Sequence, residues 1–135
     1  MPFVVLNILF FLKKDMIILR DYDKDKRIDR VWYESSSILY SECEDVKDNF
    51  KVLRVVFKNG SQYQYKDVDV NDYVMFVHGG LDGSNGKALN TFIKKKCEYT
   101  KLDNINLDEL NLLKEEIQAK QLKEKENENT EQSTE

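Results

Sequence analysis

The sequence contains few of the residues on which several classes of protein depend. Its 135 residues include one histidine, two cysteines and one proline. Two cysteines are too few for a disulfide scaffold, and Cys43 and Cys97 do not form a C-x-x-C pair. A single histidine, His78, excludes a histidine-rich metal cluster. We therefore expect a protein that carries no metal and no other cofactor.

Long hydrophobic runs are also lacking. The apolar run from Phe3 to Leu12 is much shorter than the roughly 20 residues that a membrane-spanning helix needs. No basic residues precede it and no small-residue cleavage site follows it, so it does not have the form of a secretory signal. We expect a cytoplasmic protein whose translation starts at Met16, with residues 1–15 as an apolar extension. The alternative is that this extension anchors the chain at a membrane surface.

The charges are unevenly distributed along the chain. The sequence is 41% hydrophobic, 11% aromatic and 34% charged, with a formal net charge of −4. This composition suits one small domain with a modest core. From Lys101 onward there are 5 lysines and 10 acidic residues, so the first hundred residues carry 16 basic and 15 acidic side chains. The acidic excess belongs to the C-terminal part and does not exclude an anionic partner for the rest.

The clearest pattern is a β-hairpin in residues 51–68. Its turn could be a two-residue Asn59-Gly60 turn or a three-residue loop of residues 58–60, with Gly60 left-handed in a G1 bulge. Only the three-residue loop places the apolar side chains of both strands on one face, so it is the register that we predict. Those side chains are Leu53, Val55, Phe57, Tyr63 and Tyr65.

Two short helices are expected after the hairpin. Asn71 or Asp72 is predicted to cap the first, which the pair Gly79-Gly80 ends. Ser84 is predicted to cap the second. That helix has an apolar stripe at helical spacing, formed by Ala88, Leu89, Phe92 and Ile93.

These elements predict an α+β fold, in which a small antiparallel sheet of three or four strands packs against two short helices and a further helix follows. Short β-prone runs at 31–33 and 38–43 precede the hairpin, and the charged stretch 21–30 is expected to be loop or strand edge. The expected organisation is a domain over residues 16–100, a C-terminal helix over 101–125 capped by Asn106, and a disordered polar tail over 126–135.

A known family shares part of this pattern. The chain has a hydrophobic strand, a turn ending in glycine, a Tyr-x-Tyr strand, a short helix, and a Ser-x-Gly-Lys-x-x-Asn-x-x-Ile segment. The residues that carry the pattern are Tyr63, Tyr65, Ser84, Gly86, Lys87, Asn90 and Ile93. It resembles the KTSC domain, named after the C-terminal extension of some lysyl-tRNA synthetases and also found as small free-standing bacterial and phage proteins. The chain departs from the family in lacking a proline after the second strand and in having three lysines after Ile93.

The resemblance implies no established activity, and RNA binding is the function usually suggested for such domains. Basic side chains on the outer face of the sheet and on the second helix are the candidate contacts to RNA or to another phosphate-bearing ligand. The alternative is that they are ordinary solubilising charges. The candidate binding residues are Arg54, Lys66, Ser84, Gly86, Lys87, Asn90, Lys94, Lys95 and Lys96. Tyr63 and Tyr65 could stack on bases, but the predicted register turns them toward the core. Ile93, on the apolar stripe of the second helix, is also expected to be structural.

A second hypothesis is a protein-interaction protein, such as a phage accessory factor. Leu110, Leu113 and Ile117 have helical spacing and could dock on a partner or on a second copy of the chain. We do not expect an enzyme, because His78 lies at a helix end without an identifiable partner and the cysteines have no catalytic signature. The glycines before Lys87 do not match the P-loop spacing, although they could form a simple anion cradle.

Overall fold

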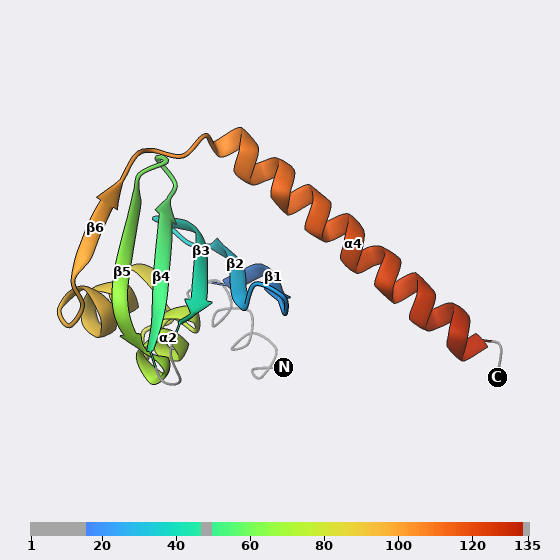
Figure 1. Cartoon of the computed structure of the whole chain (residues 1–135), viewed down its shortest axis with the longest axis horizontal. Helices are drawn as coiled ribbons and strands as arrows, with labels where there is room; N and C mark the ends of the chain where they lie inside the picture. Colours follow the sequence, from blue (N-terminus) through green and yellow to red (C-terminus); the bar gives the residue numbers. More distant parts are fainter. Residues whose placement is uncertain (1–15, 47–49, 134–135) are drawn as a thin grey trace, which may run out of the picture. The chain divides into compact units, whose positions relative to one another are not determined.

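The computed structural model describes residues 16–46 and 50–133, in two units that meet between Asn104 and Ile105. The first unit contains a six-stranded antiparallel sheet whose strands are neighbours in the order in which they occur in the sequence (Figure 1). Antiparallel neighbours can be joined by short connections, so this order needs no long crossover. The strands are β1 (Met16–Asp23), β2 (Ile28–Glu34), β3 (Ile38–Asp45), β4 (Phe50–Phe57), β5 (Gln62–Asp69) and β6 (Tyr99–Leu102).

The β4–β5 hairpin has the register that its turn chemistry predicts. The Phe57 amide donates to the Ser61 carbonyl at 2.9 Å, and Gly60 has a φ of 91°. That left-handed conformation is favourable for glycine and unfavourable for most other residues. Val55 lies opposite Tyr63 in the ladder, so the predicted apolar face is confirmed.

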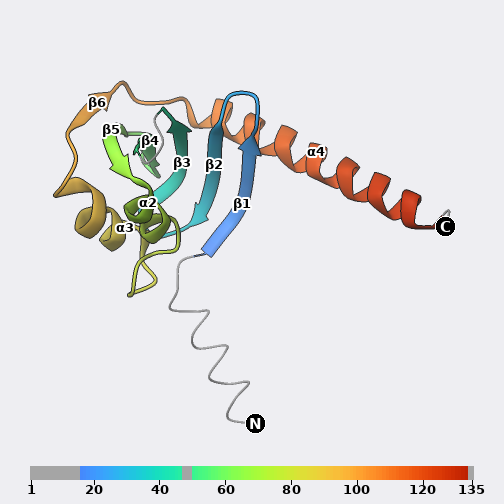
Figure 2. The same cartoon turned by 60° about the horizontal axis from the view of Figure 1, so that its bottom comes forward.

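Two helical segments lie between β5 and β6, and both are visible in Figure 2. Helix α2 (Val70–Val77) begins at Asp69, whose side chain accepts from the Asn71 amide at 2.9 Å; the predicted caps, Asn71 and Asp72, are therefore wrong by two or three residues. Helix α3 (Asn85–Ala88) begins at Ser84 as predicted. It continues directly into the π-helix η1 (Leu89–Lys94).

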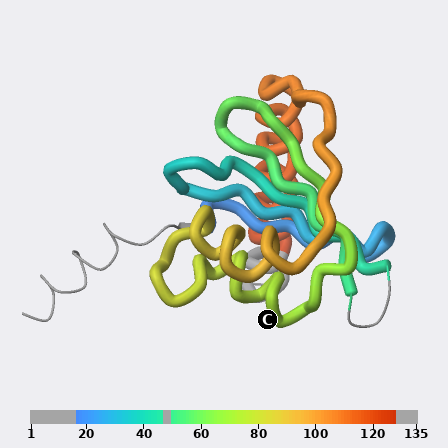
Figure 3. Tube along the Cα trace, turned by 90° about the vertical axis from the view of Figure 1, so that its left-hand side faces the viewer, coloured from blue at the N-terminus to red at the C-terminus, as the bar shows by residue number. Residues whose placement is uncertain are grey.

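The core lies between the helices and one face of the sheet. The helical segment, drawn in green to yellow in Figure 3, runs along that face. Buried side chains from β2 to β5 meet those of α2 and η1 there. Phe57, Tyr63 and Phe92 are partly buried at the margin of this core. The buried cluster consists of Val31, Tyr33, Ile38, Cys43, Leu53, Val55, Tyr65, Val68, Tyr73, Phe76, Val77, Leu89 and Ile93.

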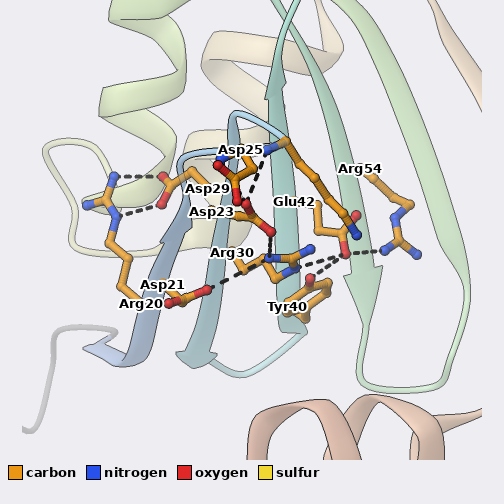
Figure 4. Close-up of polar contacts among 10 residues, drawn as sticks. Arg20, Asp21, Asp23, Asp25, Asp29, Arg30, Tyr40, Glu42 and Arg54 are labelled. Atoms are coloured by element: carbon orange, nitrogen blue, oxygen red, sulfur yellow. Dashed lines mark hydrogen bonds and ion pairs between the residues drawn. The ribbon is translucent and has the colours of Figure 1, made fainter. Parts of the chain in front are cut away.

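The α+β class is confirmed, but the sheet is larger than predicted. Strand β6 was not predicted, and the charged stretch 21–30 continues β1 and β2 as a hairpin. Arg20 and Asp29 form an ion pair at 2.8 Å across this hairpin, as Figure 4 shows. Such cross-strand pairs stabilise two strands whose sequence has no apolar alternation. Hydrophobic periodicity alone therefore does not predict this hairpin.

The second unit is the helix α4 (Leu107–Ser133). The Asn106 side chain accepts from the Asp108 amide at 2.9 Å, so the predicted cap is confirmed. Residues 101 and 102 of the expected C-terminal segment 101–125 belong to β6, and the helix continues through 126–133, where a disordered tail was predicted. Residues 126–133 contain neither glycine nor proline, the usual signals for a helix end.

The predicted apolar extension, residues 1–15, lies outside the residues that the structure describes. Among the helices of the described part, none has both the length and the apolar character required to cross a membrane.

Candidate functional site

The lysines of the second helix do not form one surface. Lys87, Asn90, Thr91 and Lys94 would share a flank at α-helical spacing. Residues 89–94, however, form the wider π-helix, in which hydrogen bonds run from i to i+5, and α-helical spacing does not hold there. Lys87 and Thr91 line one cavity, whereas Lys94 lines another. Lys87 and Lys94, at the two ends of the predicted basic helix, therefore lie at different parts of the surface.

The larger of these two cavities lies beside Lys94. It has a volume of about 380 Å³ and is formed by three segments that are distant in the sequence: the turn before β3, the β4–β5 hairpin and the end of η1. The Lys58 amide donates to the Ser37 carbonyl at 2.9 Å and joins the first two segments. We call this space the hairpin cavity; its lining residues are Ser37, Phe57, Lys58, Asn59, Ser61, Tyr63 and Lys94.

Two positive charges and no carboxylate line the hairpin cavity. The Lys94 ammonium lies 5.8 Å from the centre of the Phe57 ring, within cation–π range. Within the part of the chain that the structure describes, Lys94 forms no ion pair. The remaining polar groups are the hydroxyls of Ser37 and Ser61 and the amide of Asn59, whose oxygen already accepts from Ser61 at 2.7 Å. This set of groups suits an anion.

Aromatic rings extend from the cavity to the edge of the sheet. Phe57 and Tyr63 meet edge to face with centroids 5.7 Å apart, and Tyr63 meets Tyr99 in the same manner at 5.9 Å. We call Phe57, Tyr63 and Tyr99 the aromatic row. Tyr63 is half-buried and Tyr99 is 63% exposed, whereas Tyr65 is fully buried, and burial raises its pKa to about 12. The structure therefore places Tyr65 in the core and Tyr63 at its margin.

The glycine of the Ser-x-Gly-Lys motif, Gly86, has a structural role next to the cavity. A Cβ atom at this position would lie 3.0 Å from the Ser37 hydroxyl oxygen, tighter than ordinary contact. Glycine therefore lets the turn that contains Ser37 approach helix α3. Ser84 is likewise engaged as the helix cap, with its hydroxyl 3.3 Å from the Lys87 amide.

Arg54 is committed to a network on the opposite face of the sheet. It donates to Glu42 at 2.7 Å, and Tyr40 and Arg30 also contact this carboxylate (Figure 4). Burial by itself raises the pKa of Glu42, but hydrogen bonds from Arg54 and Tyr40 and the charge of Arg30 outweigh it, so the pKa lies below its ordinary value. The arginine is thus neutralised within the protein.

The other predicted binding residues are dispersed. Lys96 lies 3.3 Å from the Asp72 carboxylate, and Lys66, Asn90 and Lys95 are exposed outside the hairpin cavity. Lys87 borders a smaller cavity of about 100 Å³ that includes the Asp82 carboxylate, an unfavourable neighbour for a phosphate. Ile93 is buried, as predicted. Of the candidate lysines, the structure brings Lys94 alone to the hairpin cavity.

The thiols and the apolar stripe of α4 can also be placed. Burial raises the pKa of Cys43 to about 12, which keeps the thiol protonated and unsuited to nucleophilic attack near neutral pH. Leu110, Leu113 and Ile117 all lie within α4, three and four residues apart. Their role in association stays a prediction.

Residues 47–99 match the family model of the KTSC domain. This match supports the resemblance to the KTSC domain over a segment that includes β4, β5 and the helices up to the first residue of β6. No curated protein matches the chain.

Sequence reasoning missed most of the cavity. The sequence pattern does not single out Ser37 or Ser61, and it places Lys58 and Asn59 only in a turn and Phe57 only on the apolar face of the hairpin. Tyr99 and Lys101 lie on β6, whose four residues are too few to show a periodic pattern. An available signal was the Lys-Asn-Gly-Ser turn, which puts a cation and two polar side chains at the tip of an aromatic hairpin.

Proposed function

We propose that this chain is a non-enzymatic binding module that holds RNA through its phosphates, centred on Lys94 and the hairpin cavity. The observation that carries the proposal is the convergence of Lys94 and Lys58, from different elements, on one cavity without a carboxylate in its lining. Flexible cations are the principal phosphate ligands of RNA-binding proteins. The Ser37 hydroxyl of the cavity can donate a further hydrogen bond to a phosphate oxygen.

The position of Lys94 supports a ligand contact better than a purely solubilising role. Its ammonium is held over an aromatic ring at the rim of a cavity, whereas Lys96 and Arg54 are held by the protein's own carboxylates. A cation that faces a ring and a polar cavity can exchange water for a phosphate without breaking an ion pair. We therefore assign the central contact to Lys94 and only peripheral electrostatic attraction to Lys95.

Charge reversal at two adjacent lysines tests this assignment. Lys94→Glu and Lys95→Glu change the net charge equally, but only the first places the new charge at the cavity. We expect Lys94→Glu to weaken the binding of labelled single-stranded RNA by about tenfold or more, and Lys95→Glu to weaken it only slightly. The measurement is fluorescence anisotropy of the full chain at two salt concentrations. Loss of one phosphate contact should also reduce the salt slope by about 0.7.

Inorganic polyphosphate, tested as a competitor, distinguishes a phosphate site from a site that needs the whole nucleotide. Displacement of RNA by polyphosphate from the wild-type chain, and not from Lys94→Glu, would support phosphate recognition at the cavity. Equal effects of the Lys94 and Lys95 substitutions would contradict the proposal, because they would show binding by net charge alone. Absence of RNA binding at low salt would also contradict it.

A further inference from the structure

We infer that edge strand β6 extends the phosphate site into a stacking platform for an unpaired base, with Tyr99 as the stacking residue and Lys101 as a further phosphate contact. This inference rests on the proposed function and names its ligand more closely: single-stranded RNA that crosses β5 and β6. None of the residues predicted from the sequence to bind a ligand lies on this strand.

The ladder register places the platform next to the hairpin cavity. In the β5–β6 pair Tyr63 lies opposite Lys101, and Tyr65 lies opposite Tyr99. Residues directly opposite each other in an antiparallel pair project from the same face of the sheet. Tyr63, which lines the cavity, therefore has Phe57 on one side and Tyr99 and Lys101 on the other.

Tyr99 combines an exposed ring with a fixed position. It is 63% exposed, although its ring contacts Tyr63 at 5.9 Å and the buried Tyr65 at 6.2 Å between centroids. The contacts on one side hold the ring, and the exposed part is available to a planar ligand. A base can stack on such a ring whatever its identity, because every base has a π-face.

The charges near Tyr99 select a chain of nucleotides over an uncharged aromatic ligand. Lys101 is exposed on β6 opposite Tyr63, and Lys58 and Lys94 lie at the cavity that Tyr63 lines. Cations next to an aromatic platform match the sugar–phosphate backbone that continues from a stacked base. A duplex keeps its bases paired and stacked inside, so the platform favours single strands.

Substitution of Tyr99 tests the platform, and Tyr22 supplies a matched control. Tyr22 is 49% exposed and lies on β1, the edge strand at the other side of the same sheet. We expect Tyr99→Ala to weaken binding of labelled oligouridine by about tenfold, while Tyr99→Phe, which keeps the ring, and Tyr22→Ala bind as wild type does. Polyphosphate has no base, so its affinity should be the same in all three variants.

The outcomes separate this inference from the proposed function. Equal affinities of Tyr99→Ala and Tyr22→Ala for oligouridine, together with a loss in Lys94→Glu, would overturn the platform and leave the phosphate site intact. Equal wild-type affinity for oligouridine and for an RNA duplex of the same length would also overturn the platform. Failure of the wild-type chain to bind either probe would overturn both. Thermal melting of each variant checks that β6 remains folded.

Discussion

The basic residues of this protein fall into two regions with opposite surroundings. Across β1 to β4, Arg20, Arg30 and Arg54 each lie within ion-pair distance of an aspartate or glutamate on a neighbouring strand. At the hairpin cavity, Lys58 and Lys94 share a lining that contains aromatic rings and hydroxyls but no acid. A satisfied charge holds strands together, whereas a charge that faces a cavity can attract an anion. Net charge therefore says little about where this chain could bind.

The largest expected effect on stability lies in the arginine region. Glu42→Gln removes the carboxylate that Arg54 and Arg30 share but keeps the size of the side chain. Because these groups are largely buried, we expect a loss of about 2 kcal/mol in the free energy of unfolding. Urea denaturation measures it. The affinity for single-stranded RNA should stay unchanged, and a matching loss of RNA binding would show that the two regions are not independent.

The same carboxylate predicts an acid dependence of stability. Since the pKa of Glu42 is lower in the folded chain than in the unfolded one, its contribution is complete above the unfolded value of about 4.3. This contribution to the free energy of unfolding is lost as the pH falls through the pKa that Glu42 has in the folded chain. The difference in unfolding free energy between wild type and Glu42→Gln should therefore shrink below about pH 4. A difference that is constant from neutral pH to pH 3 would contradict this.

The smallest expected effect concerns the close approach of Gly86 to Ser37, one of the residues that line the hairpin cavity. Gly86→Ala places a Cβ atom against the Ser37 hydroxyl, but it also gains helix propensity, so the net change should be below about 1 kcal/mol. In a Ser37→Ala background the hydroxyl is gone. There the same substitution should be more favourable by about 0.5 kcal/mol, as a double-mutant cycle of urea midpoints measures. Additive changes in the free energy of unfolding would show that the Ser37 hydroxyl does not oppose a Cβ atom at residue 86 of helix α3.

Local chemistry made part of the fold predictable. The register of the β4–β5 hairpin follows from Gly60 and from the alternation of apolar side chains on its two strands. Ser84 and Asn106 each cap a helix with a side-chain oxygen that accepts from a backbone amide two or three residues later. This is the property for which serine and asparagine are predicted as helix caps. These signals lie within a few residues of the structures that they specify.

The site was much less predictable than the hairpin. Of the nine residues proposed as ligand contacts, Arg54 is engaged with Glu42, Lys96 is near Asp72, and Lys87 and Lys94 line two different cavities. Residues 89–94 wind as a π-helix, to which α-helical spacing does not apply, and Lys87 and Lys94 line different cavities. The local composition does not predict the change from α-helix to π-helix at residue 89.

The sequence by itself determined the α+β class, the hairpin register, two helix starts and the KTSC motif, because each depends on residues close together in the chain. Only the tertiary structure decided that Ser37, Lys58 and Lys94 meet at one cavity and that Tyr99 lies beside Tyr63. Those neighbours come from segments distant in the sequence. Which strands pair, and in what register, is set by burial of the whole core and by cross-strand contacts that no short window of sequence contains.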